Sequence, residues 1–306
     1  MDISLSELIA TSRNSEGVLP SYFSLPKDKD DKLARFADGA LDGITIYHMG
    51  ITPLSEEEKD KLGKLITLAS SGEFKEAEEG FTEFTKPHRT ITIIDDIQRF
   101  IVDGNNKLNH DNLYDFSVEL LMNSKNTECV KVALSILELY NVYENEALAK
   151  IVRILGLSDE FTIFSMFLMR SWPEGEKEIL ELAKRVKGWG RIHCVEFITT
   201  ENDETKEWLL YNGVDNYVVP AYSAWVVYNK ADVEGVLKEE NLSYDKIHAL
   251  LKITDALMDE GPLHGISNME DPKAYLDSIL NKVRDDLSLT EEDKKIVEAI
   301  KEWKEK

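Results

Sequence analysis

The residue types best suited to recognition chemistry are concentrated in one short segment, GWGRIHCVEF at 188–197. It places Trp189, Arg191 and His193 at the start of a predicted helix. A guanidinium group can donate two hydrogen bonds to one carboxylate, and an indole face can stack on a planar group or a cation. The segment is therefore a candidate binding site for a carboxylate or a planar group. The alternative is structural: Trp189 packs between helices and Arg191 pairs with a neighbouring acid.

A second candidate lies in the aromatic-rich stretch 208–228. Its aromatic residues are Trp208, Tyr211, Tyr217, Tyr222, Trp225 and Tyr228. Tyrosine and tryptophan are enriched at the energetic centres of protein interfaces, so Trp225 and Tyr228 are candidate binding residues. The helical spacing of Tyr222, Trp225 and Val226 fits a core-facing stripe as well.

Three residues are weak candidates for metal ligands. Asp38 and Asp42 each precede a glycine and would share one face of a helix that begins at Asp31 and includes 36–43, with His48 further on. Carboxylates in this arrangement can bind a cation through oxygen. Because Asp-Gly is also a turn signal, the same residues fit a helix end with a solvated acidic face. We predict no bound metal and no other cofactor.

The familiar catalytic motifs are absent from the sequence. It contains no P-loop, GxGxxG, HExxH, GxSxG or paired CxxC motif. We therefore predict no catalytic residues and favour a protein that is not an enzyme. Cys129 and Cys194 both lie in apolar helical stretches and are expected to be reduced core thiols of a cytoplasmic protein.

The elements that must position these residues are paired amphipathic segments. The pairs are 111–122 with 129–140, 146–155 with 160–172, 176–186 with 191–199, 204–211 with 220–230, and 233–239 with 244–258. Second members that are apolar nearly all round, such as 161–169, are expected to be buried between neighbouring hairpins. Pairs at a loosely regular period are typical of helical repeats.

In this pattern, residues 111–260 resemble the HEAT-like α-solenoids. The resemblance implies a curved scaffold whose inner helices line a concave surface that holds a protein or, in some members, a nucleic acid. We therefore expect an all-α fold with two parts: an irregular helical region at 1–105, and an α-solenoid at 106–306 that ends in a capping helix at 291–304.

The N-terminal third is helical but irregular. Ser55 and Glu58 form a predicted capping box at a helix start. The segment 72–81 resembles the second half of a tetratricopeptide unit, with Gly72, Phe74 and Phe81 at matching offsets. The resemblance implies one further helical hairpin.

The charge of the chain restricts its partners. With 58 acidic and 36 basic residues, its formal net charge is −22, which opposes binding to nucleic acid or to an anionic membrane surface. Charge and architecture together predict a cytoplasmic protein-binding scaffold, adaptor or inhibitor whose partner has a basic surface. The alternative function is a small-molecule or nucleic-acid-modifying enzyme built on a helical-repeat scaffold.

Overall fold

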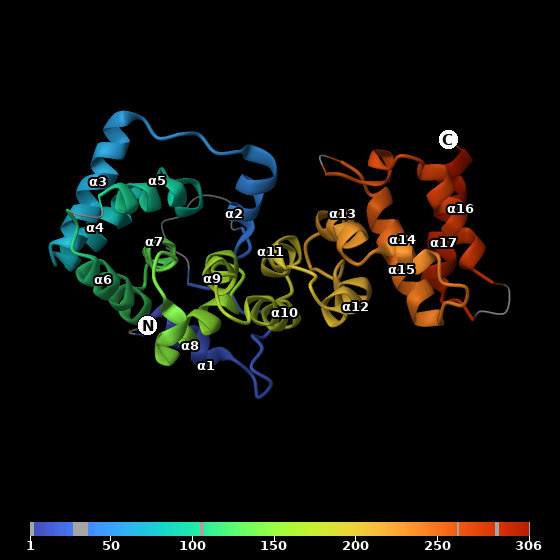
Figure 1. Cartoon of the computed structure of the whole chain (residues 1–306), viewed down its shortest axis with the longest axis horizontal. Helices are drawn as coiled ribbons and strands as arrows, with labels where there is room; N and C mark the ends of the chain where they lie inside the picture. The colour runs from blue at the N-terminus through green and yellow to red at the C-terminus, as the bar shows by residue number, and fades with distance from the viewer. Residues whose placement is uncertain (1–2, 27–35, 105–106, 262, 285–287, 306) are drawn as a thin grey trace. The chain divides into compact units, whose positions relative to one another are not determined.

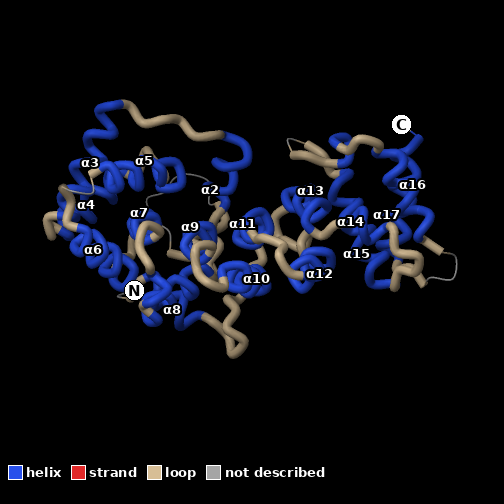
Figure 2. Tube along the Cα trace, in the orientation of Figure 1, coloured by secondary structure: helices blue, strands red, loops and turns tan. Residues whose placement is uncertain are grey.

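The computed structural model describes residues 3–26, 36–104, 107–261, 263–284 and 288–305, and their regular structure is entirely helical (Figure 1). Figure 2 shows helices and loops and no strand in this part of the chain. The prediction of an all-α protein is therefore confirmed. The chain divides into two compact units, unit 1 (Met1–Gly190) and unit 2 (Arg191–Lys306).

Unit 1 holds the first ten α-helices and the start of the eleventh. They are α1 (Leu5–Ser12), α2 (Ala40–Ile44), α3 (Glu56–Ser70), α4 (Phe74–Phe84), α5 (Thr90–Asp103), α6 (His110–Asn123), α7 (Thr127–Leu137), α8 (Glu146–Gly156), α9 (Thr162–Met169), α10 (Gly175–Arg185) and α11 (Trp189–Phe197). A π-helical turn, η1 (Thr45–Met49), continues α2, and a 3₁₀ turn, η2 (Val142–Glu144), precedes α8.

The core of unit 1 is built around α7. All residues of this helix from Cys129 to Leu137 are buried, because α7 packs against α4, α5, α6 and α9. Helix α1 packs against both α6 and α8, although it is far from them in the sequence. The predicted boundary near residue 105 lies inside this unit, where α3 packs against α6 and α5 packs against α7.

Unit 2 holds the rest of α11 and six further α-helices. These are α12 (Asp203–Asn212), α13 (Ala221–Lys230), α14 (Val233–Leu237), α15 (Tyr244–Met258), α16 (Pro272–Lys282) and α17 (Glu291–Glu305), with a 3₁₀ turn, η3 (Ile266–Asn268), before α16. Helix α15 is central, since it packs against α12, α13, α16 and α17.

Local sequence accounts for many of the helix ends. The predicted capping box at Ser55 and Glu58 is present at the start of α3. A second reciprocal cap starts α17, where the Asp293 N–H donates to Thr290 Oγ1 at 3.1 Å and Asp293 Oδ2 accepts from the Thr290 N–H at 3.1 Å. These side chains satisfy N–H groups that have no partner within the helix.

The helix expected from Asp31 through 36–43 is present at 40–43 and is wrong at 36–39, which are not helical. Residues 31–35 lie outside the described residues, and α2 begins only at Ala40. The preceding residue, Gly39, has φ +75°, a left-handed conformation that glycine adopts without steric cost. A Cβ there would also approach the Asp159 carbonyl oxygen to 2.5 Å. The Asp38-Gly39 pair therefore forms a turn.

Candidate functional site

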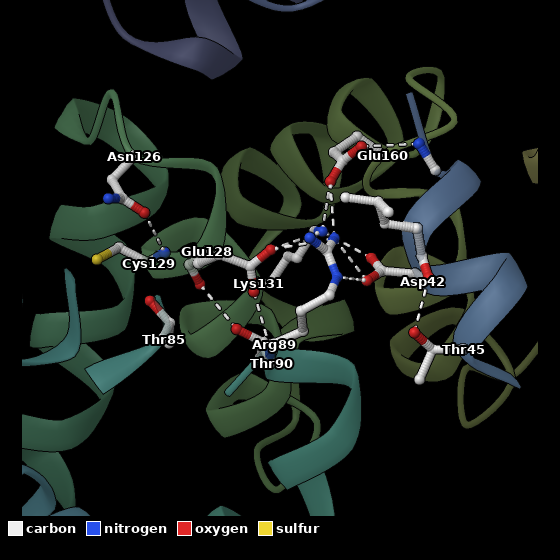
Figure 3. Close-up of polar contacts among 12 residues, drawn as sticks. Asp42, Thr45, Thr85, Arg89, Thr90, Asn126, Glu128, Cys129, Lys131 and Glu160 are labelled. Carbon is white, nitrogen blue, oxygen red and sulfur yellow. Dashed lines mark hydrogen bonds and ion pairs between the residues drawn. The ribbon is translucent and has the colours of Figure 1, made fainter. Parts of the chain in front are cut away.

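A cluster of five charged side chains lies inside unit 1, and we call Asp42, Arg89, Glu128, Lys131 and Glu160 the ionic cluster (Figure 3). Lys131 is fully buried. Its Nζ lies 2.6 Å from Asp42 Oδ2, 3.1 Å from Glu128 Oε1 and 2.5 Å from Glu160 Oε1. Arg89 adds a second cation, with Nε 2.7 Å from Asp42 Oδ1.

Helix starts bring the ionic cluster together. Arg89 immediately precedes α5, Glu128 is in the first turn of α7 with Lys131 one turn further on, and Glu160 lies just before α9. The carboxylates also cap neighbouring segments: Glu128 Oε2 accepts from the Thr90 N–H at 2.8 Å, and Glu160 Oε2 from the Gly39 N–H at 2.7 Å. Carboxylates are stabilised near helix N-termini by the free N–H groups and the helix dipole.

The electrostatics of the ionic cluster favour the charged forms of Glu128, Glu160 and Lys131, whereas burial opposes the charge of Asp42. Burial opposes ionisation of Glu128, but Lys131 and Arg89 outweigh it and lower the pKa of this carboxyl to about 2. Burial raises the pKa of Asp42 despite the same two cations. Burial also opposes the charge of Lys131, yet the three carboxylates raise its pKa. Mutual pairing of this kind anchors α2 to α5, α7 and α9.

The candidates around residue 190 lie in the interior. Trp189, Arg191 and His193 are 5%, 3% and 1% exposed. A Cβ on Gly43 would overlap the Trp189 ring. The Arg191 guanidinium lies 5.3 Å from the centre of the Trp208 ring and donates to the Asp215 carbonyl oxygen at 3.1 Å.

The three weak metal candidates do not share a site. The Asp38 carboxylate accepts from Ser24 Oγ at 3.0 Å and from the Leu25 N–H at 2.9 Å, while Asp42 belongs to the ionic cluster. His48 is exposed on η1. Across the described ranges, no group of three or more histidine, cysteine or acidic residues could hold a metal ion. Both cysteines are buried and neither forms a disulfide.

The remaining two candidates line a groove within unit 2. Trp225 and Tyr228, on α13, border a hollow of about 740 Å³ together with Tyr275 of α16. The acidic residues Glu234, Glu270 and Asp271 line the same hollow, with Lys238 as a basic member. We call this hollow the aromatic groove.

The rings of the aromatic groove are held by one another and by a carboxylate. Trp225 stacks on Tyr228 with 5.6 Å between ring centres, and Tyr228 meets the edge of Tyr275 at 5.6 Å and 88°. The Tyr228 hydroxyl donates to Glu234 Oε1 at 2.6 Å. Burial, aided by Glu234, raises the pKa of Tyr228. The groove thus presents fixed aromatic surfaces beside carboxylates, a combination that suits an organic cation.

A further polar group joins α15 to α17 in unit 2. Asp293, whose side chain is fully buried, accepts from His248 Nδ1 at 2.6 Å and from the Tyr244 hydroxyl at 2.7 Å. Burial opposes its ionisation, but these hydrogen bonds and those from Thr290 lower the pKa of Asp293 to about 2. This arrangement fastens the C-terminal helix.

Sequence reasoning did not identify Arg89, Glu128, Lys131 and Glu160. One signal was present: Lys131 interrupts the apolar run CVKVALSIL with Glu128 one turn before it. A lysine on the buried face of a helix needs an acidic partner, but the sequence does not show which one.

Comparison of the chain with protein-family models, with curated proteins and with solved structures finds no match. Within the part that the structure describes, no helix is long and apolar enough to cross a bilayer.

Proposed function

We propose that this chain is a protein-binding scaffold, adaptor or inhibitor, and that the aromatic groove holds a basic segment of its partner. The observation that supports the proposal is the composition of the groove. Trp225, Tyr228 and Tyr275 line it with aromatic surface, and Glu234, Glu270 and Asp271 surround them with negative charge.

The proposed architecture is a HEAT-like stack of helical hairpins in a cytoplasmic protein. Helices α5, α7 and α9 pack in series in unit 1, and α12, α13 and α15 pack on one another in unit 2. Two cysteines outside any disulfide fit a reducing compartment. A stacked array suits binding because each added hairpin extends one continuous surface.

Charge supports a basic partner through short-range pairing in the groove and through long-range attraction. Within the groove, three carboxylates face one ammonium group, so a basic side chain gains direct pairing. At longer range, the net charge of −22 attracts a basic protein and accelerates encounter at low salt.

The test follows the indole N–H signal of Trp225 by nuclear magnetic resonance, with Trp225→Phe used only to assign that signal. The probe is the octapeptide GRGKGRGK, and GEGEGEGE is its acidic counterpart. Ala274→Arg places an arginine in the groove, because Ala274 is an exposed lining residue in the first turn of α16. Ala147→Arg, at an exposed position in the first turn of α8, is the matched control.

We expect the basic peptide to shift the Trp225 signal and to bind more weakly at 300 mM than at 50 mM salt, since paired surface charges are screened. Ala274→Arg should weaken binding about tenfold or more, because it occupies the site with a tethered competitor. Ala147→Arg should leave binding unchanged. An unmoved Trp225 signal, equal binding of the acidic peptide or insensitivity to salt would overturn the proposal.

A further inference from the structure

We infer that the basic residue taken up by the aromatic groove is an arginine, whose guanidinium stacks on Trp225 and pairs with Glu270. The inference rests on the proposed function, because it names the side chain that the partner inserts.

Unit 1 contains an example of this interaction within the chain itself. The Arg153 guanidinium lies 4.9 Å from the centre of the Trp172 ring. The same group is bidentate to Glu178, with Nε to Oε2 at 2.9 Å and Nη2 to Oε1 at 2.5 Å. An indole, a guanidinium and a carboxylate thus form one compact unit at a partly exposed position.

Unit 2 repeats part of the pattern with Arg191 over Trp208. Trp225 differs from both of these indoles. Among the described residues no lysine or arginine lies over its ring, which contacts Tyr228 and His264 instead. The groove therefore has the indole and the carboxylates, but among the described residues no cation lies over the indole, although Lys238 lines the groove elsewhere.

Two of the three groove carboxylates already have partners. Glu234 accepts from the Tyr228 hydroxyl, and Asp271 caps α16 by accepting from the Ala274 N–H at 3.0 Å. Glu270 is exposed and makes no hydrogen bond or ion pair with another described residue. It is the carboxylate most available to a guanidinium.

Arginine fits this chemistry better than lysine. Its planar guanidinium can stack on a ring and at the same time donate two parallel hydrogen bonds to one carboxylate, and it is less strongly hydrated than an ammonium group. Lysine can supply charge but neither the flat surface nor the paired donors. The two residues should therefore differ in affinity at an indole beside a carboxylate.

The experiment compares three octapeptides, GXGXGXGX with arginine, lysine or citrulline as X, again by the Trp225 indole signal. Citrulline keeps the planar shape and removes the charge. Glu270→Gln removes the assigned carboxylate at an exposed position, and Glu302→Gln on α17, also exposed, is the matched control. We expect the arginine peptide to bind about tenfold more tightly than either of the others.

Glu270→Gln should bring the arginine peptide to within about twofold of the lysine peptide, and Glu302→Gln should change nothing. Equal binding of the arginine and lysine peptides would overturn this inference while leaving the proposed function intact. Equal binding of citrulline and arginine would overturn the role of charge, and an unaltered preference in Glu270→Gln would overturn the assignment of that residue. If no basic peptide shifted Trp225, the proposed function itself would fail.

Discussion

Removing the buried ammonium group of Lys131 should be among the most destabilising single changes in unit 1. In the native cluster three carboxylates face two cations. In Lys131→Met the side chain still fills much of the space, but three carboxylates then face Arg89 alone. Removing one partner of a buried pair costs about 3–5 kcal/mol, because the remaining charge is left uncompensated. That is a large fraction of the stability of a typical domain.

The unfolding free energy lost in Lys131→Met should depend on pH, and the direction follows from the pKa of the carboxyls. In the native protein the pKa of Glu128 is lowered to about 2, so its stabilising contribution is complete above its ordinary pKa and is lost as the pH falls toward 2. Without Lys131 the carboxylates take up protons at higher pH, which relieves their repulsion. The difference in unfolding free energy between wild type and Lys131→Met should therefore be smaller at pH 5 than at pH 7.5.

The assay is urea denaturation with pulsed hydrogen exchange of peptides from α7, which reports on unit 1 separately from unit 2. Lys177→Met is the control, since Lys177 makes an exposed ion pair with Glu174 and should change little. The double variant Asp42→Asn with Lys131→Met restores the native balance of charge and should be less destabilised than the sum of its single variants by about 1 kcal/mol or more. This account of the ionic cluster would be refuted if Lys131→Met had the unfolding free energy of wild type at pH 7.5. It would also be refuted if the destabilisation of the double variant equalled the sum of the two single variants.

Two further carboxylates should contribute to stability with opposite dependence on pH. Burial raises the pKa of Asp159 from its ordinary value of 3.8 to about 6, so its contribution is greatest below pH 4 and is lost as the pH rises through 6. Asp159→Asn should reduce the fall in unfolding free energy between pH 4 and pH 7 by about 2–3 kcal/mol. Urea titrations at the two pH values that gave the same fall for the variant as for wild type would contradict this. The pKa of Asp293 is instead lowered to about 2, so its contribution is present above pH 4 and disappears as the pH falls to 2. Asp293→Asn should destabilise unit 2 by about 1–2 kcal/mol at pH 7, and thermal melts at pH 7 and pH 2.5 should show the difference shrinking.

The sequence predicted individual helices well because their signals are local. The predicted segment 244–258 coincides with α15, which Ser243 caps by accepting from the Lys246 N–H. The predicted segment 204–211 lies within α12, whose cap is Asn202. Helix caps and apolar periodicity are sequence signals that extend over only one or two helical turns, so they can be recognised without knowledge of the fold. At Gly39 the Asp-Gly pair gave a turn signal, but the apolar pattern that continues through it predicted a helix; the structure has the turn, with Gly39 left-handed and closely packed against Asp159.

The ionic cluster was not predictable from such local signals. Lys131 and Asp42 are separated by 89 residues, and their contact depends on how α2 lies against α7. An amphipathic pattern shows which face of a helix is covered, but not by which neighbour. The sequence could therefore indicate that Lys131 needs an acid and could not select Asp42 and Glu160 among the many acids of the chain.

The tryptophans show why the candidate site needed the structure. By residue type Trp189 and Trp225 are equivalent candidates, and each lies beside polar residues in a helix. The structure separates them by what covers the ring: the Trp189 ring packs directly on Gly43, where a Cβ would overlap it, while Trp225 borders a groove that the residues around η3 and the start of α16 leave uncovered. Helical periodicity places Trp225 and Tyr228 on one face of α13, yet coverage of that face is decided by segments more than thirty residues away. A recognition residue is therefore distinguished from a core residue by tertiary packing, and in this chain that criterion favours Trp225.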